Sequence, residues 1–140
     1  MRAYFDASVL VALLTEDALT TRAEAFIRDV APIPVVSDFA AAEFASALAR
    51  RVRTGEIEAR HADQAFEVLD TWISRVVERA ETTSSDVKVA ETFLRRFDVN
   101  LRTPDALNIA IAKRVDAALV TFDEKMAAAA SVIGSTVLPA

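Results

Sequence analysis

The segment Arg2-Ala3-Tyr4-Phe5-Asp6-Ala7-Ser8, with the apolar run 9–14 behind it, determines the architecture predicted for this chain. Its first four residues have the composition of a short strand that ends at Asp6. Residues 7–14 follow at once, and because alanine and leucine dominate them they favour a buried helix over a second strand. An acidic side chain therefore stands at the turn from a strand to a helix.

Short apolar segments then alternate with segments of helical periodicity along the rest of the chain. Further strands are expected at residues 33–36, 117–122 and 136–138, and the ambiguous stretch 80–85 leaves room for a brief edge strand. Further helices are expected at 39–53, 58–79, 103–115 and 124–130, together with an amphipathic segment around 23–30 and a helix that begins at Ser85 or Asp86. This alternation is typical of a parallel sheet covered on both faces, which is an α/β fold.

Two helix starts and two helix faces are specific enough to be checked. Ser37 or Asp38 is expected to cap the helix at 39–53, and the Thr103-Pro104-Asp105 segment predicts an N-cap hydroxyl followed by proline and an acid in the first turn. The periodicity places Val76 and Phe97 on buried helix faces.

Composition limits the class of protein. The chain has 140 residues, 53% of them hydrophobic, with only two glycines and four prolines, which predicts a single folded domain over residues 1–140. The absence of cysteine excludes disulfides, thiolate zinc sites and cysteine nucleophiles. No segment reads as a signal peptide or approaches the roughly 20 apolar residues that span a bilayer, so a cytoplasmic location is expected.

The net charge of −5 argues against non-specific binding of nucleic acid by the protein alone. Two bound divalent ions would reduce that charge to about −1, so a phosphate-bearing substrate is not excluded. Its binding would then depend on metal.

Four acidic residues stand where an apolar segment ends or is interrupted: Asp6, Glu43, Asp105 and Asp123. Asp6 and Asp123 follow strands, and in open parallel sheets sites form beyond the carboxyl ends of the strands. Unpaired carboxylates near a core are costly to desolvate, and a hard divalent cation held by oxygen ligands is the simplest reason to gather them.

Each acid also has an ordinary structural explanation. Asp6, Asp105 and Asp123 suit helix starts, where a carboxylate caps the helix or interacts favourably with its dipole. Glu43 has Arg50 as a possible partner two turns along its helix, or it could face solvent.

Other polar residues bear on this choice. Asn108 follows Asp105 by three positions on an otherwise apolar helix, which favours a polar site there. The arginines gather at helix ends, for example Arg51 and Arg114, where most are expected to be solvated and some to flank a phosphate backbone. His61 lies in a polar stretch and is expected at the surface.

Taken in order, these pieces resemble the PIN-domain ribonucleases, most closely the VapC-like toxins of bacterial type II toxin–antitoxin pairs. The matching pieces are Tyr4-Phe5-Asp6-Ala7-Ser8, Ala42-Glu43-Phe44, Pro104-Asp105-Ala106-Leu107 with Asn108-Ile109-Ala110, and Val120-Thr121-Phe122-Asp123. The resemblance covers essentially the whole chain.

The resemblance implies a PIN-like three-layer fold with a short parallel sheet of about five strands. It implies that Asp6, Glu43, Asp105 and Asp123 bind Mg²⁺, for which Mn²⁺ can substitute, with Ser8 and Thr121 as polar neighbours that orient ligands or water. It also implies an RNA substrate such as transfer or ribosomal RNA, a homodimer, and a cognate antitoxin whose tail occludes the site.

The resulting hypothesis is metal-assisted hydrolysis of RNA without a histidine or lysine base. Asp6 and Asp105 are the expected direct ligands; Glu43 either coordinates or receives the proton of the water, and Asp123 binds directly or through a water. A phosphatase with Asp6 as nucleophile is disfavoured because Ser8, not a second aspartate, lies two residues on. The remaining alternative is a catalytically inert PIN-like module that binds RNA or dimerises.

Overall fold

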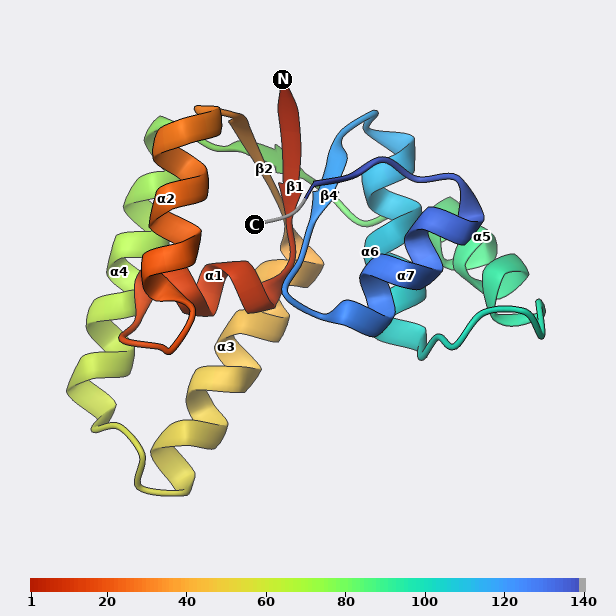
Figure 1. Cartoon of the computed structure of the whole chain (residues 1–140). Coiled ribbons are helices and arrows are strands. Elements are labelled where there is room, and N and C mark those ends of the chain that lie inside the picture. The colour runs from red at the N-terminus through yellow and green to blue at the C-terminus, as the bar shows by residue number, and fades with distance from the viewer. Residues whose placement is uncertain (139–140) are drawn as a thin grey trace.

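The computed structural model describes residues 1–138 as a parallel sheet with helices on both faces (Figure 1). In chain order the elements are β1 (Arg2–Phe5), α1 (Ala7–Leu14), α2 (Thr20–Val30), β2 (Ile33–Ser37), α3 (Asp38–Arg53), α4 (Ala59–Arg75), β3 (Glu78–Ala80), α5 (Ser84–Leu94), α6 (Thr103–Arg114), β4 (Ala118–Val120), α7 (Glu124–Ile133) and β5 (Val137–Leu138). None of the helices in this part of the chain is long and apolar enough to cross a membrane.

The five strands lie in the order β3-β2-β1-β4-β5, and every neighbouring pair is parallel. β1 is therefore central, with Tyr4 opposite Val35 of β2 and Leu119 of β4. Figure 1 shows α1, α2 and α4 on one side of the sheet and α5, α6 and α7 on the other. The predicted α/β fold with about five parallel strands and three layers is confirmed.

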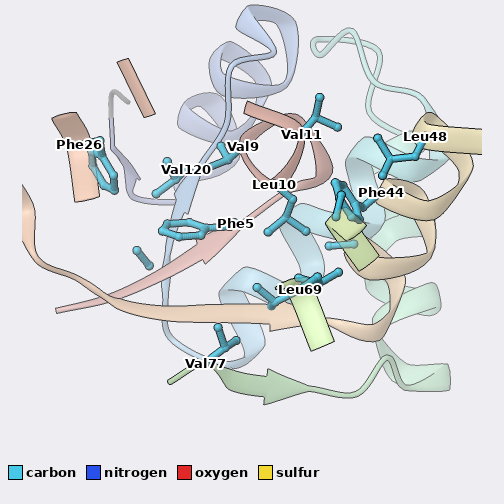
Figure 2. Close-up of a cluster of buried hydrophobic side chains, with 14 of the residues drawn as sticks. Phe5, Val9, Leu10, Val11, Phe26, Phe44, Leu48, Leu69, Val77 and Val120 are labelled. Atoms are coloured by element: carbon cyan, nitrogen blue, oxygen red, sulfur yellow. The ribbon is translucent and has the colours of Figure 1, made fainter. Parts of the chain in front are cut away.

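Each face of the sheet has its own hydrophobic core, because successive strand residues point to opposite faces. Ala3 and Phe5 of β1 belong to the core under α1, α2, α3 and α4, whereas Tyr4 belongs to the core under α5, α6 and α7. In the first core Phe5 stacks with Trp72 of α4 at a centroid distance of 6.0 Å and meets Phe26 of α2 edge-on at 6.3 Å. Figure 2 shows Phe5 among the aliphatic side chains of this cluster.

The predicted cap of α3 is confirmed, whereas the start of α6 differs from the prediction. Ser37 caps α3 by accepting a hydrogen bond from the Ala40 amide at 2.9 Å. At α6 the cap position belongs to Arg102 instead of Thr103, so the predicted hydroxyl cap is wrong. The Asp105 carboxylate serves this end instead, by accepting a hydrogen bond from the Arg102 amide at 3.1 Å.

The connection from α4 to β3 also differs from the prediction. α4 ends at Arg75 instead of continuing to residue 79, and Val76, predicted to be inward, is exposed. The backbone that follows pairs with β2, where Glu78 lies opposite Val35, so the edge strand comes earlier than the ambiguous stretch at 80–85. Helical periodicity could not reveal this change, because strand pairing depends on a distant partner.

Phe97 is the largest error on a helix face. α5 ends at Leu94, so Phe97 lies in the connection to α6 and is 102% exposed instead of buried. Phe93, Leu94 and Leu101 on either side of it still pack against the second core. The apolar pattern is a correct guide up to the end of the helix and fails beyond it, where the backbone is no longer helical.

Candidate active site at the carboxyl edge of the sheet

The amino-terminal ends of α1, α3, α6 and α7 meet at the carboxyl edge of the sheet, at the lower centre of Figure 1. Asp6 follows β1 directly and is the N-cap of α1, accepting a hydrogen bond from the Val9 amide at 3.2 Å. Its own amide donates to the Val120 carbonyl of β4 at 3.4 Å. The residue is only 3% exposed, so its carboxylate lies buried at the edge of the sheet.

Two hydroxyl groups hold the Asp6 carboxylate. Ser8 Oγ donates to Asp6 Oδ1 at 2.6 Å and accepts from the Phe122 amide at 3.0 Å. Thr121 Oγ1 donates to Asp6 Oδ2 and accepts from the Asp123 amide at 3.0 Å. Both hydroxyls thus connect the turn after β1 to the turn after β4 and fix the orientation of Asp6.

Glu43 and Asn108 meet across α3 and α6. Asn108 Nδ2 donates to Glu43 Oε1 at 2.8 Å and to the Pro104 carbonyl at 3.0 Å. Asn108 is buried and Glu43 is half-buried. Of the alternatives for Glu43, neither a pair with Arg50 nor a purely solvent-facing side chain describes it, because the described contact of its carboxylate is with Asn108 of α6.

The two remaining acids also serve as helix caps, as their ordinary structural explanation predicted. Half-buried Asp105 uses Oδ2 to accept from the Arg102 amide, and exposed Asp123 uses Oδ1 to accept from the Met126 amide at 3.0 Å. A capping role occupies one oxygen of each carboxylate and does not exclude a second role for the side chain.

Electrostatic repulsion links the four acids in neighbouring pairs. Burial raises the pKa of Asp6, against the hydrogen bonds from Ser8 and Thr121. Burial also raises the pKa of Glu43, and the charges of Asp6 and Asp105 add to that effect. The pKa of Asp105 is raised by burial and by the charge of Asp123. The fold therefore brings the four carboxylates into one negatively charged region.

The donor set of this region consists of oxygens, which suits a hard cation such as Mg²⁺ or Mn²⁺. Mutual repulsion and burial both favour a positive charge among Asp6, Glu43 and Asp105. Within residues 1–138, no three carboxylate or imidazole side chains converge closely enough to hold one ion between them in their present rotamers. Shared binding of one ion would require side-chain movement, for which half-buried Glu43 and Asp105 and exposed Asp123 have more room than buried Asp6.

Stability of the metal-free protein is expected to rise as the pH is lowered from 7 to 5. The pKa values of Asp6, Glu43 and Asp105 are raised on folding, so their contribution to stability is full below the unfolded value of about 4 and is lost as pH rises through the folded values. Thermal unfolding in chelator at several pH values measures the effect.

The same series has an internal control at lower pH. Although burial opposes it, hydrogen bonds from Arg114 and Thr83 lower the pKa of Asp86, whose contribution is therefore lost as pH falls below about 4. The midpoint of thermal unfolding should therefore be highest between the range from pH 7 to pH 5, where it rises, and the range below about pH 4, where it falls. A midpoint that is constant or falls from pH 7 to pH 5 would contradict the repulsion described above.

Beside this region, sequence reasoning missed the hydrogen-bonding role of Tyr4 and foresaw Ser37 only as a helix cap. The Tyr4 hydroxyl lies 2.6 Å from Ser37 Oγ and 2.6 Å from Asn108 Oδ1. A tyrosine in the middle of a buried strand was the available signal, because a buried phenol needs a partner. The surface position predicted for His61 is confirmed.

Comparisons with known proteins were made on the whole chain. Residues 3–132 match the model of the PIN domain family. No curated protein matches the sequence.

Among solved structures, a similar one is VapC20 of Mycobacterium tuberculosis, described as a sarcin–ricin loop cleaving toxin, with a TM-score of 0.75 and 22% identity over 97% of this chain and 98% of that one. VapBC2 from Rickettsia felis, bound to a promoter DNA fragment, gives a TM-score of 0.65 and 17% identity over 99% and 97%. FitAcB from Neisseria gonorrhoeae gives 0.63 and 14% over 98% and 95%. These likenesses show a shared fold, and since the family model covers nearly the whole sequence, the chain belongs to the PIN-domain family.

Proposed function

We propose that this chain is a metal-dependent endoribonuclease and the toxin of a toxin–antitoxin pair. The observation that carries the proposal is the buried Asp6 carboxylate, held by Ser8 and Thr121 within the electrostatic influence of Glu43. Membership of the PIN-domain family and the fold shared with VapC20 support the same function.

Each acidic residue has a proposed role. Asp6 and Asp105 would bind Mg²⁺ directly, and Asp123 would bind it directly or through a water. When bound, such a cation lowers the pKa of a coordinated water and offsets charge on the phosphoryl oxygens. Glu43, whose Oε1 is held by Asn108, would either complete the ligand set or take the water's proton on Oε2.

The proposed reaction is hydrolysis. The water oxygen adds to phosphorus, the bond from phosphorus to the 3′ oxygen breaks, and the 3′ oxygen takes a proton from solvent, which leaves a 5′-phosphate and a 3′-hydroxyl. Before a cation binds, the carboxylates would repel an RNA phosphate, so productive RNA binding should require metal.

The test is to sequence RNA ends after brief expression of the wild-type chain. New 5′-phosphorylated ends at a small set of sites are expected, and they should identify the target RNA. Purified protein should cleave that RNA in Mg²⁺ or Mn²⁺ and stop in chelator. If no new ends appear although the folded protein accumulates, the nuclease proposal is wrong.

Metal binding is tested separately by thermal unfolding with and without Mn²⁺. At a concentration 100 times the dissociation constant, a single site that exists only in the folded protein adds about 2.7 kcal/mol of stability. A protein that keeps the fold as an inert RNA-binding or dimerising module would show no shift at millimolar Mn²⁺. This measurement does not depend on knowing the RNA target.

The proposed antitoxin partner has a candidate docking surface. A cavity of about 610 Å³ opens between α1, α2 and α4, lined mainly by the apolar residues Leu13, Leu14, Ile27, Val68, Trp72 and Val76. Val68 and Val76 are exposed within it, and exposed apolar surface of this kind marks interaction sites. A groove between helices suits an amphipathic helix of the antitoxin.

Val68→Glu is expected to weaken binding of the antitoxin by about tenfold or more, because it places a charge in an apolar contact. The variant should keep its folding stability, since the side chain is already exposed. Calorimetry with the antitoxin, recovered by co-purification with the tagged chain, measures the affinity. Val132→Glu is a matched control, because Val132 is equally exposed at 54% but lies on α7. Equal affinities of the two variants would place the antitoxin elsewhere.

A further inference from the structure

Tyr4 occupies an unusual place in the second core. It lies in the middle of the central strand β1, is fully buried, and points to the face opposite Phe5. Its hydroxyl reaches between β2 and α6, 2.6 Å from both Ser37 Oγ and Asn108 Oδ1. A phenylalanine would fill the same space without a polar group to satisfy, so the hydroxyl needs its own explanation.

Donor and acceptor counting fixes the direction of these hydrogen bonds. Asn108 Oδ1 only accepts, so the single Tyr4 O–H donates to it, and Ser37 must donate its own hydroxyl proton to the Tyr4 oxygen. Ser37 Oγ in turn accepts from the Ala40 amide at 2.9 Å. The result is a one-way chain of bonds that starts at the cap of α3 and ends on the Asn108 oxygen.

The partners on the other side of the Asn108 amide agree with this direction. With Oδ1 held by Tyr4, Nδ2 must face Glu43 Oε1 at 2.8 Å and the Pro104 carbonyl at 3.0 Å. A reversed amide would set its oxygen against two acceptors, which is unfavourable in a buried place. Tyr4 thus holds the oxygen side of the amide on which Glu43 depends, and none of its described hydrogen bonds goes to Glu43 itself.

We propose that Tyr4 is a positioning residue of the carboxylate site, which acts through Asn108 to hold Glu43 in the orientation needed for cleavage. The inference rests on the proposed function. It is analogous to the partners that orient ligating side chains in metal sites, whose loss typically lowers metal affinity or activity about 10- to 100-fold.

The test compares Tyr4→Phe with Ser37→Ala. Both variants lose the bond between Tyr4 and Ser37, but only Tyr4→Phe removes the donor to Asn108. Tyr4→Phe is expected to lower kcat about 10- to 100-fold with little change in KM for RNA. Ser37→Ala should keep kcat within about threefold although it also loses the α3 cap and some stability.

A double-mutant cycle separates positioning from general destabilisation. If Tyr4 acts only through Asn108, Tyr4→Phe should cause no further loss of kcat in an Asn108→Ala background. Equal losses of kcat in Tyr4→Phe and Ser37→Ala, or full additivity with Asn108→Ala, would overturn the proposal.

A spectroscopic readout keeps the inference testable if the chain proves inactive. The side-chain amide of Asn108 should give two sharp, protected NMR signals in the wild type and in Ser37→Ala, and these should shift or broaden in Tyr4→Phe. An unchanged Asn108 amide in Tyr4→Phe rejects the positioning role, whatever the activity. Failure of RNA cleavage by the wild type with these NMR differences intact rejects only the proposed function.

Discussion

Asp6→Asn is expected to reduce RNA cleavage about 1,000-fold or more, on the scale of losing a group that stabilises charge in the transition state. The substitution removes a charge but few contacts. The oxygen of the new amide would still accept from Ser8 and Val9, and the Thr121 hydroxyl can reverse to accept from the amide nitrogen. The loss of activity should therefore reflect the loss of a charged ligand and not a change of fold.

The same variant should be more stable than the wild type when metal is absent. Burial raises the pKa of Asp6, which means that the folded protein holds this charge at a cost near neutral pH. An uncharged amide removes that cost and also reduces the repulsion felt by Glu43. Loss of activity together with a higher thermal midpoint in chelator is a combination that general damage to the fold would not produce.

Cleavage of the identified RNA under single-turnover conditions measures the first effect, and thermal unfolding in chelator measures the second. Asp63→Asn is the matched control, because Asp63 is an exposed acid on α4. It should leave both quantities unchanged. Cleavage by Asp6→Asn at the wild-type rate in Mg²⁺ would show that the residue is not a ligand.

The sequence predicted most of the architecture because much of it depends on local signals. The β1 strand, the alanine- and leucine-rich α1 and the acid between them are adjacent, so one stretch of residues determines both the turn and the position of Asp6. The same holds for Asp123 between β4 and α7. Parallel topology then brings such turns to one edge of the sheet.

The site contacts between distant residues could not be predicted in the same way. Tyr4 is 33 residues from Ser37 and 104 from Asn108, and nothing local indicates that the three side chains meet. Asn108 was singled out as a polar residue on an apolar helix, but its contact with Glu43 spans 65 positions. The sequence therefore identified Asn108 as a polar residue in need of a partner, but it could not show which residue that partner is.

The arginines show the same limit. Arg51 and Arg114 were expected to be solvated or to flank phosphates, and each has a specific acidic partner. Arg51 reaches Asp17 at 3.1 Å and so connects α3 to the segment after α1. A long flexible side chain at a helix end has many possible partners, and only the packing of the helices selects one.

Arg114 is the more consequential of the two, because its partner is buried. The Asp86 side chain is only 2% exposed and accepts from Arg114 Nε at 2.7 Å, from a terminal guanidinium nitrogen at 3.0 Å and from the Thr83 amide at 2.9 Å. Arg114 also donates to the Glu81 carbonyl at 2.7 Å. These contacts fasten the start of α5 to the end of α6, the helix that carries Asp105 and Asn108.

Arg114→Met should therefore lower the free energy of unfolding by about 2–3 kcal/mol. Breaking a fully buried pair costs roughly 3–5 kcal/mol, and the 37% exposure of the Arg114 side chain reduces this through solvent screening. Methionine keeps much of the apolar stem, so the change mainly reports the carboxylate left without its cation. Against a total stability of roughly 5–15 kcal/mol this is a large loss.

Urea denaturation of both proteins at pH 7 measures the difference. Arg95→Met is the control: its side chain is 81% exposed and its pair with Glu91, at 3.8 Å, should contribute well under 1 kcal/mol. At pH 3, where the Asp86 carboxyl group in the variant can be protonated, the gap between Arg114→Met and the wild type should narrow. If Arg114→Met lowers the free energy of unfolding no more than Arg95→Met does, the Asp86 carboxylate does not need its Arg114 partner. The packing of α5 against α6 would then depend on apolar contacts alone.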